Sequence, residues 1–275
     1  MGAQPLSTGF WHPALSSVLL LAALGHFGNA ALAQEAVAHP GCRDLTAWNR
    51  MAGERPQSVA ANTLLSEMSQ RDVVLLGEHH DDEDHHLWQL HTLAALYGLR
   101  PHMVIGFEMF PRRVQPALER WVAGELSVKQ LLEQTDWDNT WKAPAELYLP
   151  LLQFARINRI PLIALNVDQK LNTAIAARGL AAVPMADREG VGTPAPASDA
   201  YLKMLLQVHR QHSGLGGKDR ANALSSDPAF LNFVDSQTTW DRAMAEALAA
   251  ARKADANGEP PLVLGIMGSG HIGFC

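Results

Sequence analysis

The sequence predicts an α/β protein in which a mostly parallel sheet is flanked by helices and carries an inserted helical lid. Four short apolar runs have the character of strands, and segments with helical periodicity separate the first three. Alternating strands and helices are typical of a parallel sheet that helices cover. The four runs are residues 73–77, 103–108, 161–166 and 261–267.

Helical periodicity is present in the two segments that connect the first three strands. In residues 84–97, four apolar side chains recur at helical spacing and predict one buried face, with Asp81 or Asp82 as the N-cap. Residues 145–157 show the same period, and Ile160-Pro161 ends that helix. The apolar positions of the first helix are Leu87, Leu90, Ala94 and Tyr97.

The helical lid is predicted between the third and fourth strands, at about residues 180–232. Residues 179–198 are rich in Ala, Pro and Gly and lack periodicity, which favours a loop that leads into the lid. Residues 201–212 are predicted to form a helix that carries Tyr201, His209 and His212. A Gly-, Ser- and Asn-rich loop follows to residue 227, and a long helix is expected over residues 233–253.

The first 33 residues predict a secretory signal peptide. They contain no Lys, Arg, Asp or Glu, have an apolar core at residues 14–24 and end in Ala31-Leu32-Ala33, a small-x-small cleavage pattern. The apolar stretch is well short of the roughly 20 residues that a membrane span needs, so no span is expected in the mature chain. No lipid-attachment pattern precedes Cys42. The protein is therefore expected to be periplasmic or secreted.

Residues 34–275 are expected to form one domain, which is long enough to bury a substantial core. The net charge is −6 and no cluster of Lys or Arg occurs, which argues against nucleic acid and anionic membranes as partners. The two cysteines, Cys42 and Cys275, lie near opposite ends of the chain. In an oxidising compartment they either pair across the termini or stay two isolated thiols.

Each predicted strand is followed by side chains that suit acid–base chemistry or metal binding. In open α/β sheets, ligands bind outside the C-terminal ends of the strands, so these side chains are expected to converge in one cleft. Glu108 has apolar neighbours, which would raise its pKa unless a cation is near. The alternative for the first strand end, GEHHDDEDHH, is a solvated acidic start of a helix. The strand ends supply Glu78 with His80, Glu108, Asn166 with Asp168, and His271.

Two strand ends share the pattern Gly-x-x-His, in Gly77-Glu-His-His80 and Gly268-Ser-Gly-His271. Glycine lets the backbone turn sharply and brings each imidazole over the edge of the sheet. Two imidazoles with one or two carboxylates either hold a divalent metal or act as a base and its orienting acid. His86 on the following helix is a further candidate for the cleft, and His91 is expected on the surface. The aromatic residues Trp137, Trp141 and Tyr148 either line an apolar ligand site or belong to the core.

The motifs resemble those of a known family when they are taken together and in order. GEHHDDEDHH is followed by GFEMFPRRVQPALERWVAGELS, W-x3-W-x6-YLPLLQFAR, PLIALNV, FVDSQTTWDRAMA and GSGH. This set is similar to the ChaN-like haem-binding uptake family of the Tiki and erythromycin-esterase superfamily, from about Leu45 to the C-terminus. Members usually continue past the last Gly-x-x-His, so the resemblance implies that the chain is truncated at Cys275.

The resemblance implies a periplasmic haem-binding protein in haem or iron uptake. Members of the branch hold two haems face to face in a homodimer, where a Tyr ligates iron and a His of the partner subunit contacts the propionates. Tyr148 matches the family pattern W…Y-x-P-L-L, whereas Tyr201 begins the lid helix and is slightly favoured as the ligand. His209 or His212 is the expected partner of the propionates.

The same superfamily also implies an alternative of a different class. Some members are metal-dependent peptidases and others are esterases. In this alternative the chain is a metal-dependent hydrolase that uses Mn, Co or Zn to activate water. Its metal ligands and catalytic residues would be Glu78, His80, Glu108 and His271.

Overall fold

The computed structural model describes residues 48–52, 55–141, 143–211, 221–253 and 258–273. The chain divides into two units, Met1–Leu45 and Thr46–Cys275, and every described residue belongs to the second. The predicted signal peptide, His212 and both cysteines lie outside the described residues. None of the helices in the described part of the chain is long and apolar enough to cross a membrane.

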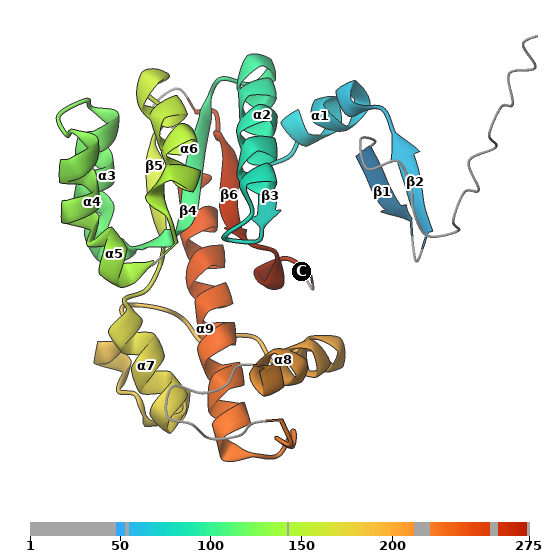
Figure 1. Cartoon of the computed structure of the whole chain (residues 1–275), viewed down its shortest axis with the longest axis vertical. Helices are drawn as coiled ribbons and strands as arrows, with labels where there is room; N and C mark the ends of the chain where they lie inside the picture. The colour runs from blue at the N-terminus through green and yellow to red at the C-terminus, as the bar shows by residue number, and fades with distance from the viewer. Residues whose placement is uncertain (1–47, 53–54, 142, 212–220, 254–257, 274–275) are drawn as a thin grey trace, which may run out of the picture. The chain divides into compact units, whose positions relative to one another are not determined.

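A four-stranded parallel sheet lies at the centre of the second unit, with the strand order β3-β6-β4-β5 (Figure 1). The last strand in the sequence therefore inserts between the first two. Its register aligns Glu78 with Gly268 and Phe107 with Ile266, so the polar strand ends meet at one edge. The predicted α/β class is confirmed. The strands are β3 (Val73–Glu78), β4 (Met103–Pro111), β5 (Leu162–Asn166) and β6 (Leu262–Gly268).

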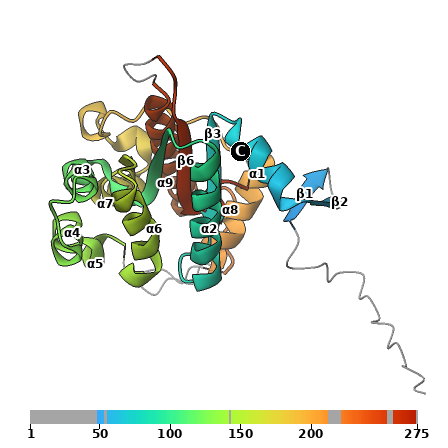
Figure 2. The same ribbon diagram turned by 90° about the horizontal axis from the view of Figure 1, so that it is seen from above.

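Helices cover both faces of this sheet (Figure 2). On one face, α2 (Glu83–Leu99), α3 (Gln115–Val122) and α6 (Ala145–Ile157) pack against alternate strand residues such as Leu264 and Ile266. On the other face, α9 (Pro228–Ala251) packs Met244 and Leu248 against a smaller apolar cluster that includes Val263. The period of two along β6 thus divides its side chains between two cores.

The side chain of Gln115 covers the edge strand β5. Its Nε2 donates to the carbonyl of Leu162, and its Oε1 accepts the N–H of Ala164. The amide group of one side chain therefore satisfies two backbone groups that a further strand would otherwise pair. This contact protects an exposed sheet edge from association with another chain.

The buried face of α2 differs from the predicted one. Leu87 is 48% exposed, whereas His86, Gln89, Leu93 and Leu96 are buried. Gln89 is buried because its Nε2 donates to the carbonyl of Leu76 at 3.0 Å. Polar residues can occupy a buried helix face when strands supply hydrogen-bond partners. The predicted face was therefore only partly right, since Leu90 and Tyr97 pack against the core whereas Leu87 and Ala94 are exposed. Asp82 is the N-cap, since its side chain accepts the N–H groups of Asp84 and His85.

Between β5 and α9 lies a region of short helices, here called the α7–α8 region (residues 169–211). It comprises α7 (Gln169–Arg178), η2 (Leu180–Ala182), η3 (Met185–Asp187) and α8 (Asp199–Gln211). Two small apolar clusters attach it to α9, one between α7 and Ala243 and one between Tyr201 and Leu205 of α8 and Phe230 of α9. The same long helix therefore supports both the sheet and this region.

Several short helices and strands were not predicted from the sequence, because their apolar patterns are too short to recognise. Ser127 and Gln130 form a capping box at the start of α4, a local signal that the apolar pattern did not include. The hairpin of β1 and β2 precedes the sheet, and its Trp48 ring packs against Trp88 of α2. These elements are β1 (Trp48–Ala52), β2 (Arg55–Val59), α1 (Ala61–Ser69), η1 (Arg112–Val114), α4 (Val128–Thr135), α5 (Trp137–Thr140) and η4 (Ser269–His271).

Candidate functional site

The first carboxylate–imidazole pair lies at the end of β3. Glu78 is buried, and its Oε1 lies 2.9 Å from Nδ1 of His80. The same oxygen accepts the hydroxyl of Tyr148 at 2.7 Å, and the other carboxylate oxygen lies 3.3 Å from Nδ1 of His86. The Glu78 carboxylate therefore holds three rings from three elements around one strand end.

Tyr148 is sealed in the core beside this pair. It is 0% exposed, its ring packs against Trp137 and His86, and Trp141 donates its indole N–H to the phenol oxygen at 3.1 Å. Burial raises the pKa of Tyr148 above its ordinary value, and the nearby charge of Glu78 raises it further. Tyr148 is accordingly a neutral hydrogen-bond donor in this arrangement.

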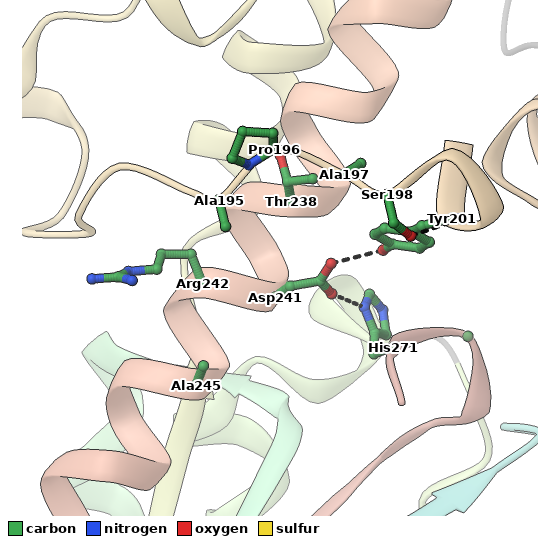
Figure 3. Close-up of a pocket in the computed structure, with 11 residues that line it drawn as sticks. Ala195, Pro196, Ala197, Ser198, Tyr201, Thr238, Asp241, Arg242, Ala245 and His271 are labelled. Atoms are coloured by element: carbon green, nitrogen blue, oxygen red, sulfur yellow. Dashed lines mark hydrogen bonds and ion pairs between the residues drawn. The ribbon is translucent and has the colours of Figure 1, made fainter. Parts of the chain in front are cut away.

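The second pair belongs to a chain of four side chains that reaches from the sheet to the α7–α8 region. Figure 3 shows three of them, His271, Asp241 and Tyr201. Glu108 accepts the N–H of Gly268 at 2.6 Å, and its other oxygen lies 3.4 Å from Nε2 of His271. Nδ1 of His271 lies 2.7 Å from Oδ1 of Asp241 on α9. Tyr201 of α8 donates its hydroxyl to Oδ2 of Asp241 at 2.7 Å. One aspartate therefore joins an imidazole at the sheet edge to a phenol of α8.

The charged groups of this chain shift the pKa values of one another. Burial alone would lower the pKa of His271, but the carboxylates of Asp241 and Glu108 outweigh it and raise this pKa to about 10. Burial alone would raise the pKa of Glu108, but the hydrogen bond and charge of His271 lower it below its ordinary value. At neutral pH an imidazolium thus lies between two carboxylates.

His80 responds in the same direction as His271. Burial alone would lower its pKa, whereas the hydrogen bond to Glu78 and the charge of Glu108 raise it. Gly268 explains how the imidazole approaches the strand end so closely, because a Cβ atom at this position would lie 2.9 Å from Cε1 of His80. The glycine of the second Gly-x-x-His motif therefore makes room for the histidine of the first.

The two pairs open onto one cavity of about 410 Å³, which His80, Glu108 and His271 line together with Trp141 and Asn166. A second cavity, of about 360 Å³, is lined by Tyr201, Asp241 and His271. His271 therefore lines both. The structure brings Glu78, His80, Glu108 and His271 together at the C-terminal edge of the sheet, while the roles assigned to them remain predictions.

The predicted metal-ligand set does not gather around a single point. Within the described residues, the three-ligand group whose atoms lie within 4.8 Å of one another is His79, Asp82 and His85, none of which lines this cavity. Each imidazole of the cleft instead pairs with a carboxylate, His80 with Glu78 and His271 with Glu108 and Asp241. As they stand, the four cleft residues form two ion pairs rather than one metal centre.

The other predicted residues lie in several places. His209 is 2% exposed and its ring packs against Phe230 and Phe233, while its role toward the propionates stays a prediction. Asn166 donates to the carbonyl of Glu108, and Asp168 caps α7 and pairs with Arg113.

The remaining histidines of α2 and its preceding turn occupy different positions. His86 is buried and faces Glu78, as expected of a residue directed toward the cleft. His91 is exposed on the outer face of α2, as expected.

Asp241 is the residue that sequence reasoning missed. It lies in the interior of the long helix α9, where one acidic residue among apolar and charged neighbours gives no sign of a site. A usable signal is the family motif FVDSQTTWDRAMA, in which Asp241 follows Trp240. In the structure the Trp240 ring also packs against His271.

Comparison with known proteins places the chain in a family. A family model described as haem-binding uptake, Tiki superfamily, ChaN, matches residues 64–275. Among solved structures, ChaN of Campylobacter jejuni, described with cofacial haem binding, is 20% identical and has a TM-score of 0.56 over 78% of this chain and 76% of its own. This similarity shows a shared fold. No curated protein matches the chain.

Two toxin structures align less closely. The RRSP effector domain of a MARTX toxin from Vibrio vulnificus is 16% identical, with a TM-score of 0.41 over 76% of this chain and 30% of that one. The C-terminal region of Pasteurella multocida toxin is 14% identical, with a TM-score of 0.40 over 77% and 21%. Both TM-scores are below 0.5, so these two matches say nothing about the function of this chain. The family model, in contrast, spans more than half of the sequence, and the chain belongs to the ChaN family of haem-binding uptake proteins in the Tiki superfamily.

Proposed function

We propose that this chain binds haem and serves haem or iron uptake in the periplasm or outside the cell. Family membership and the signal-peptide pattern of residues 1–33 support the proposal. The single structural observation that carries it is a phenol, Tyr201, at the wall of a cavity outside the main core. The proposed assembly is a homodimer, as the family resemblance implies.

Tyr201 fits an iron ligand better than Tyr148 does. A phenol with an ordinary pKa near 10 becomes a good ferric ligand only when the metal draws off its proton, and the oxygen must therefore be reachable. Tyr148 is fully buried, and its oxygen is already bonded to Glu78 and Trp141. Tyr201 is 9% exposed and lines a cavity, and its oxygen would have to give up only the hydrogen bond to Asp241 to reach an iron.

The surroundings of Tyr201 suit an apolar, flat ligand. Ala195, Pro196, Ala197 and Ala245 line the same cavity and offer small apolar surfaces. Bound haem would supply a ferric iron, which Tyr201 would ligate through its phenolate oxygen. In the protein, Asp241 orients the Tyr201 hydroxyl, and Arg242 at the cavity wall offers a positive charge to a carboxylate group of a ligand.

Titration with hemin tests this proposal. Wild-type protein is expected to give a shifted Soret band that saturates, and Tyr201→Phe is expected to lose that spectrum and at least tenfold in affinity. Tyr148→Phe serves as the matched control and is expected to keep both. Sedimentation with and without hemin measures the dimer. The proposal fails if wild type gives no saturable band, and Tyr201 is excluded if its variant binds like wild type.

A second candidate function rests on the two carboxylate–imidazole pairs that face one cavity of about 410 Å³. Such pairs serve acid–base hydrolysis of a peptide or an ester. Because the pKa of His271 is raised to about 10, its protonated ring suits a general acid or the stabilisation of developing negative charge. The metal-dependent form of this alternative has less support, because the four cleft residues do not bring three ligand atoms within 4.8 Å of one another.

Hydrolase activity is separable from haem binding by experiment. An activity on peptide or ester substrates that His271→Gln and Glu108→Gln abolish, and that Tyr201→Phe keeps, would support the second candidate. A chelator added to the same assay distinguishes a metal-dependent reaction from one that the two pairs perform alone. Equal background rates in wild type and both variants would remove this candidate.

A further inference from the structure

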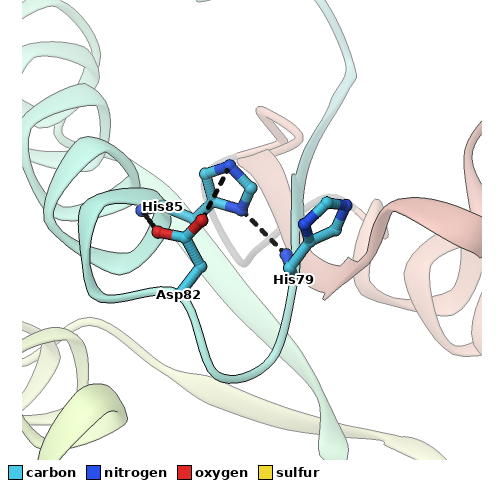
Figure 4. Close-up of side chains that lie close together, drawn as sticks. All are labelled: His79, Asp82 and His85. Atoms are coloured by element: carbon cyan, nitrogen blue, oxygen red, sulfur yellow. Dashed lines mark hydrogen bonds and ion pairs between the residues drawn. The ribbon is translucent and has the colours of Figure 1, made fainter.

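A group of metal-ligating side chains lies outside the cleft, in the turn that links β3 to α2 (Figure 4). It consists of His79, Asp82 and His85, and their ligand atoms lie within 4.8 Å of one another. We propose that these three residues bind a divalent transition-metal ion of the zinc class. The proposal is independent of haem binding, because none of the three lines either cavity described above.

The donor set selects the class of ion. Two imidazole nitrogens and one carboxylate oxygen suit Zn²⁺ and its neighbours Ni²⁺ and Cu²⁺, whereas Mg²⁺ and Ca²⁺ prefer sets made of oxygens. Three protein ligands leave a fourth position of a tetrahedral ion to water. His79 is exposed and the other two side chains are partly exposed, so an ion can enter and retain that water.

The distance between two of the donors is close to that of an assembled site. Oδ2 of Asp82 lies 3.6 Å from Nε2 of His85. Two bonds of about 2.1 Å that meet at a tetrahedral angle place their donor atoms about 3.4 Å apart. An ion can therefore bridge this pair with a movement of a few tenths of an ångström. The His79 ring completes the set by rotation of an exposed side chain.

The backbone already fixes the carboxylate. Oδ1 of Asp82 accepts the N–H groups of Asp84 and His85 as the N-cap of α2, which leaves Oδ2 on the side of the His85 ring. A helix N-terminus is positive and by itself opposes a cation. The carboxylates at positions 81, 83 and 84 add negative charge around the same turn and offset that field.

One hydrogen bond must break when the ion binds. The backbone N–H of His79 donates to Nδ1 of His85 at 2.9 Å, so a neutral His85 carries its proton on Nε2. Coordination through Nε2 moves this proton to Nδ1, and coordination through Nδ1 displaces the N–H directly. Both routes break the contact, and water can replace it at this exposed position. Loss of the contact is therefore a specific sign of metal binding.

The turn that the ion would tie down also carries His80. The carbonyl of His80 lies 3.2 Å from Nε2 of buried His86, while its ring reaches Glu78 in the cleft. An ion that joins residue 79 to residues 82 and 85 closes the turn around residue 80. The site would thus restrain one imidazole of the cleft without touching it.

Calorimetric titration of the full chain with ZnCl₂ tests the proposal. Wild type is expected to bind one Zn²⁺ that His79→Ala/His85→Ala loses, with affinity reduced at least tenfold. His91→Ala removes an exposed histidine of the same helix and is the matched control, expected to bind like wild type. His271→Ala reports any separate binding in the cleft. Equal stoichiometry and affinity in wild type and the double variant would overturn the proposal.

Amide NMR supplies a second readout that a folding defect cannot imitate. In wild type, zinc is expected to shift the His79 amide proton as its bond to His85 is lost, and the shift is expected to saturate at one equivalent. The His91→Ala variant should behave in the same way. A His79 amide that does not move while zinc binds elsewhere would also overturn the assignment.

Discussion

The two carboxylate–imidazole pairs of the cleft have similar chemistry but different supports. Glu78 and His80 are held by Tyr148, a residue of the single large core that includes α2, α3 and α6. Glu108 and His271 are held by Asp241 and Tyr201, and Tyr201 belongs to a small cluster with Leu205 and Phe230. One pair is therefore fixed by the main core, and the other depends on the α7–α8 region.

This difference shows how one fold can combine a rigid site with an adjustable one. A large apolar cluster opens only with the whole domain, whereas a small one can open locally at lower free energy. Movement of α8 would remove Tyr201 from Asp241 and change the surroundings of His271 while Glu78 and His80 stay in place. The predictions that follow test this contrast.

The largest expected effect is the loss of Trp121 from the main core. Trp121 is fully buried, and its indole N–H donates to the carbonyl of Leu152. Trp121→Ala is expected to lower the free energy of unfolding by about 3–5 kcal/mol in a urea titration. Phe230→Ala removes a buried ring of the small cluster and is expected to make the α7–α8 region sensitive to protease first. If both variants shift one common transition equally, the two regions form a single cooperative unit.

The second effect is a dependence of stability on pH that comes from His271. Its pKa is raised to about 10, so the folded state binds more protons than the unfolded state, and stability falls as pH rises. The stability that protonated His271 contributes is complete below about pH 6.5 and is lost as the pH approaches 10. Each unit by which the folded-state pKa exceeds the unfolded-state pKa corresponds to about 1.4 kcal/mol of unfolding free energy. Urea unfolding between pH 6 and 10 measures it.

Asp241→Asn removes one of the two charges that outweigh the burial of His271 and is the matched variant for this test. Its His271 pKa is expected to be lower than in wild type, so the loss of stability with rising pH is expected to be smaller and to end at lower pH. An NMR titration of the His271 ring reports the pKa directly. Identical pH profiles in wild type and variant would contradict a controlling role for Asp241.

The sequence contained most of the sheet and of the strand-end chemistry, for a clear physical reason. Strands with two buried faces are continuous apolar runs, and parallel strands must bring their C-terminal ends to one edge, so the sequence pattern alone groups Glu78, His80, Glu108 and His271. Asp241 escapes that pattern, because its partner lies 30 residues away and its position in α9 depends on tertiary packing. The prediction of the buried face of α2 was incomplete for a similar reason, since Gln89 is buried where its amide donates to the carbonyl of Leu76 on β3.

The third effect concerns the phenol that supports Glu78. Tyr148→Phe keeps the ring in the core but removes the hydroxyl that donates to the buried carboxylate at 2.7 Å. The variant is expected to lose about 1–3 kcal/mol of unfolding free energy, because the carboxylate loses a donor that water cannot replace. Tyr97→Phe, at a partly buried ring that packs on Phe154, is the control, and its change should stay within about 0.5 kcal/mol. Equal changes in both variants would contradict the role given to the Tyr148 hydroxyl.

The smallest effect tests a direct link between the two pairs. Ser269, which precedes His271 by two residues, donates its hydroxyl to the carbonyl of Glu78 at 3.1 Å. Ser269→Ala is expected to cost about 0.5 kcal/mol, the low end for a neutral hydrogen bond, because the serine is exposed and water can take its place. Ser127→Ala, which removes the capping box of α4, should cost about 1 kcal/mol under the same conditions. If Ser269→Ala instead shifts the His271 titration as far as Asp241→Asn does, the contact with β3 controls the second pair, and the contrast between a core-held and an α8-held site is wrong.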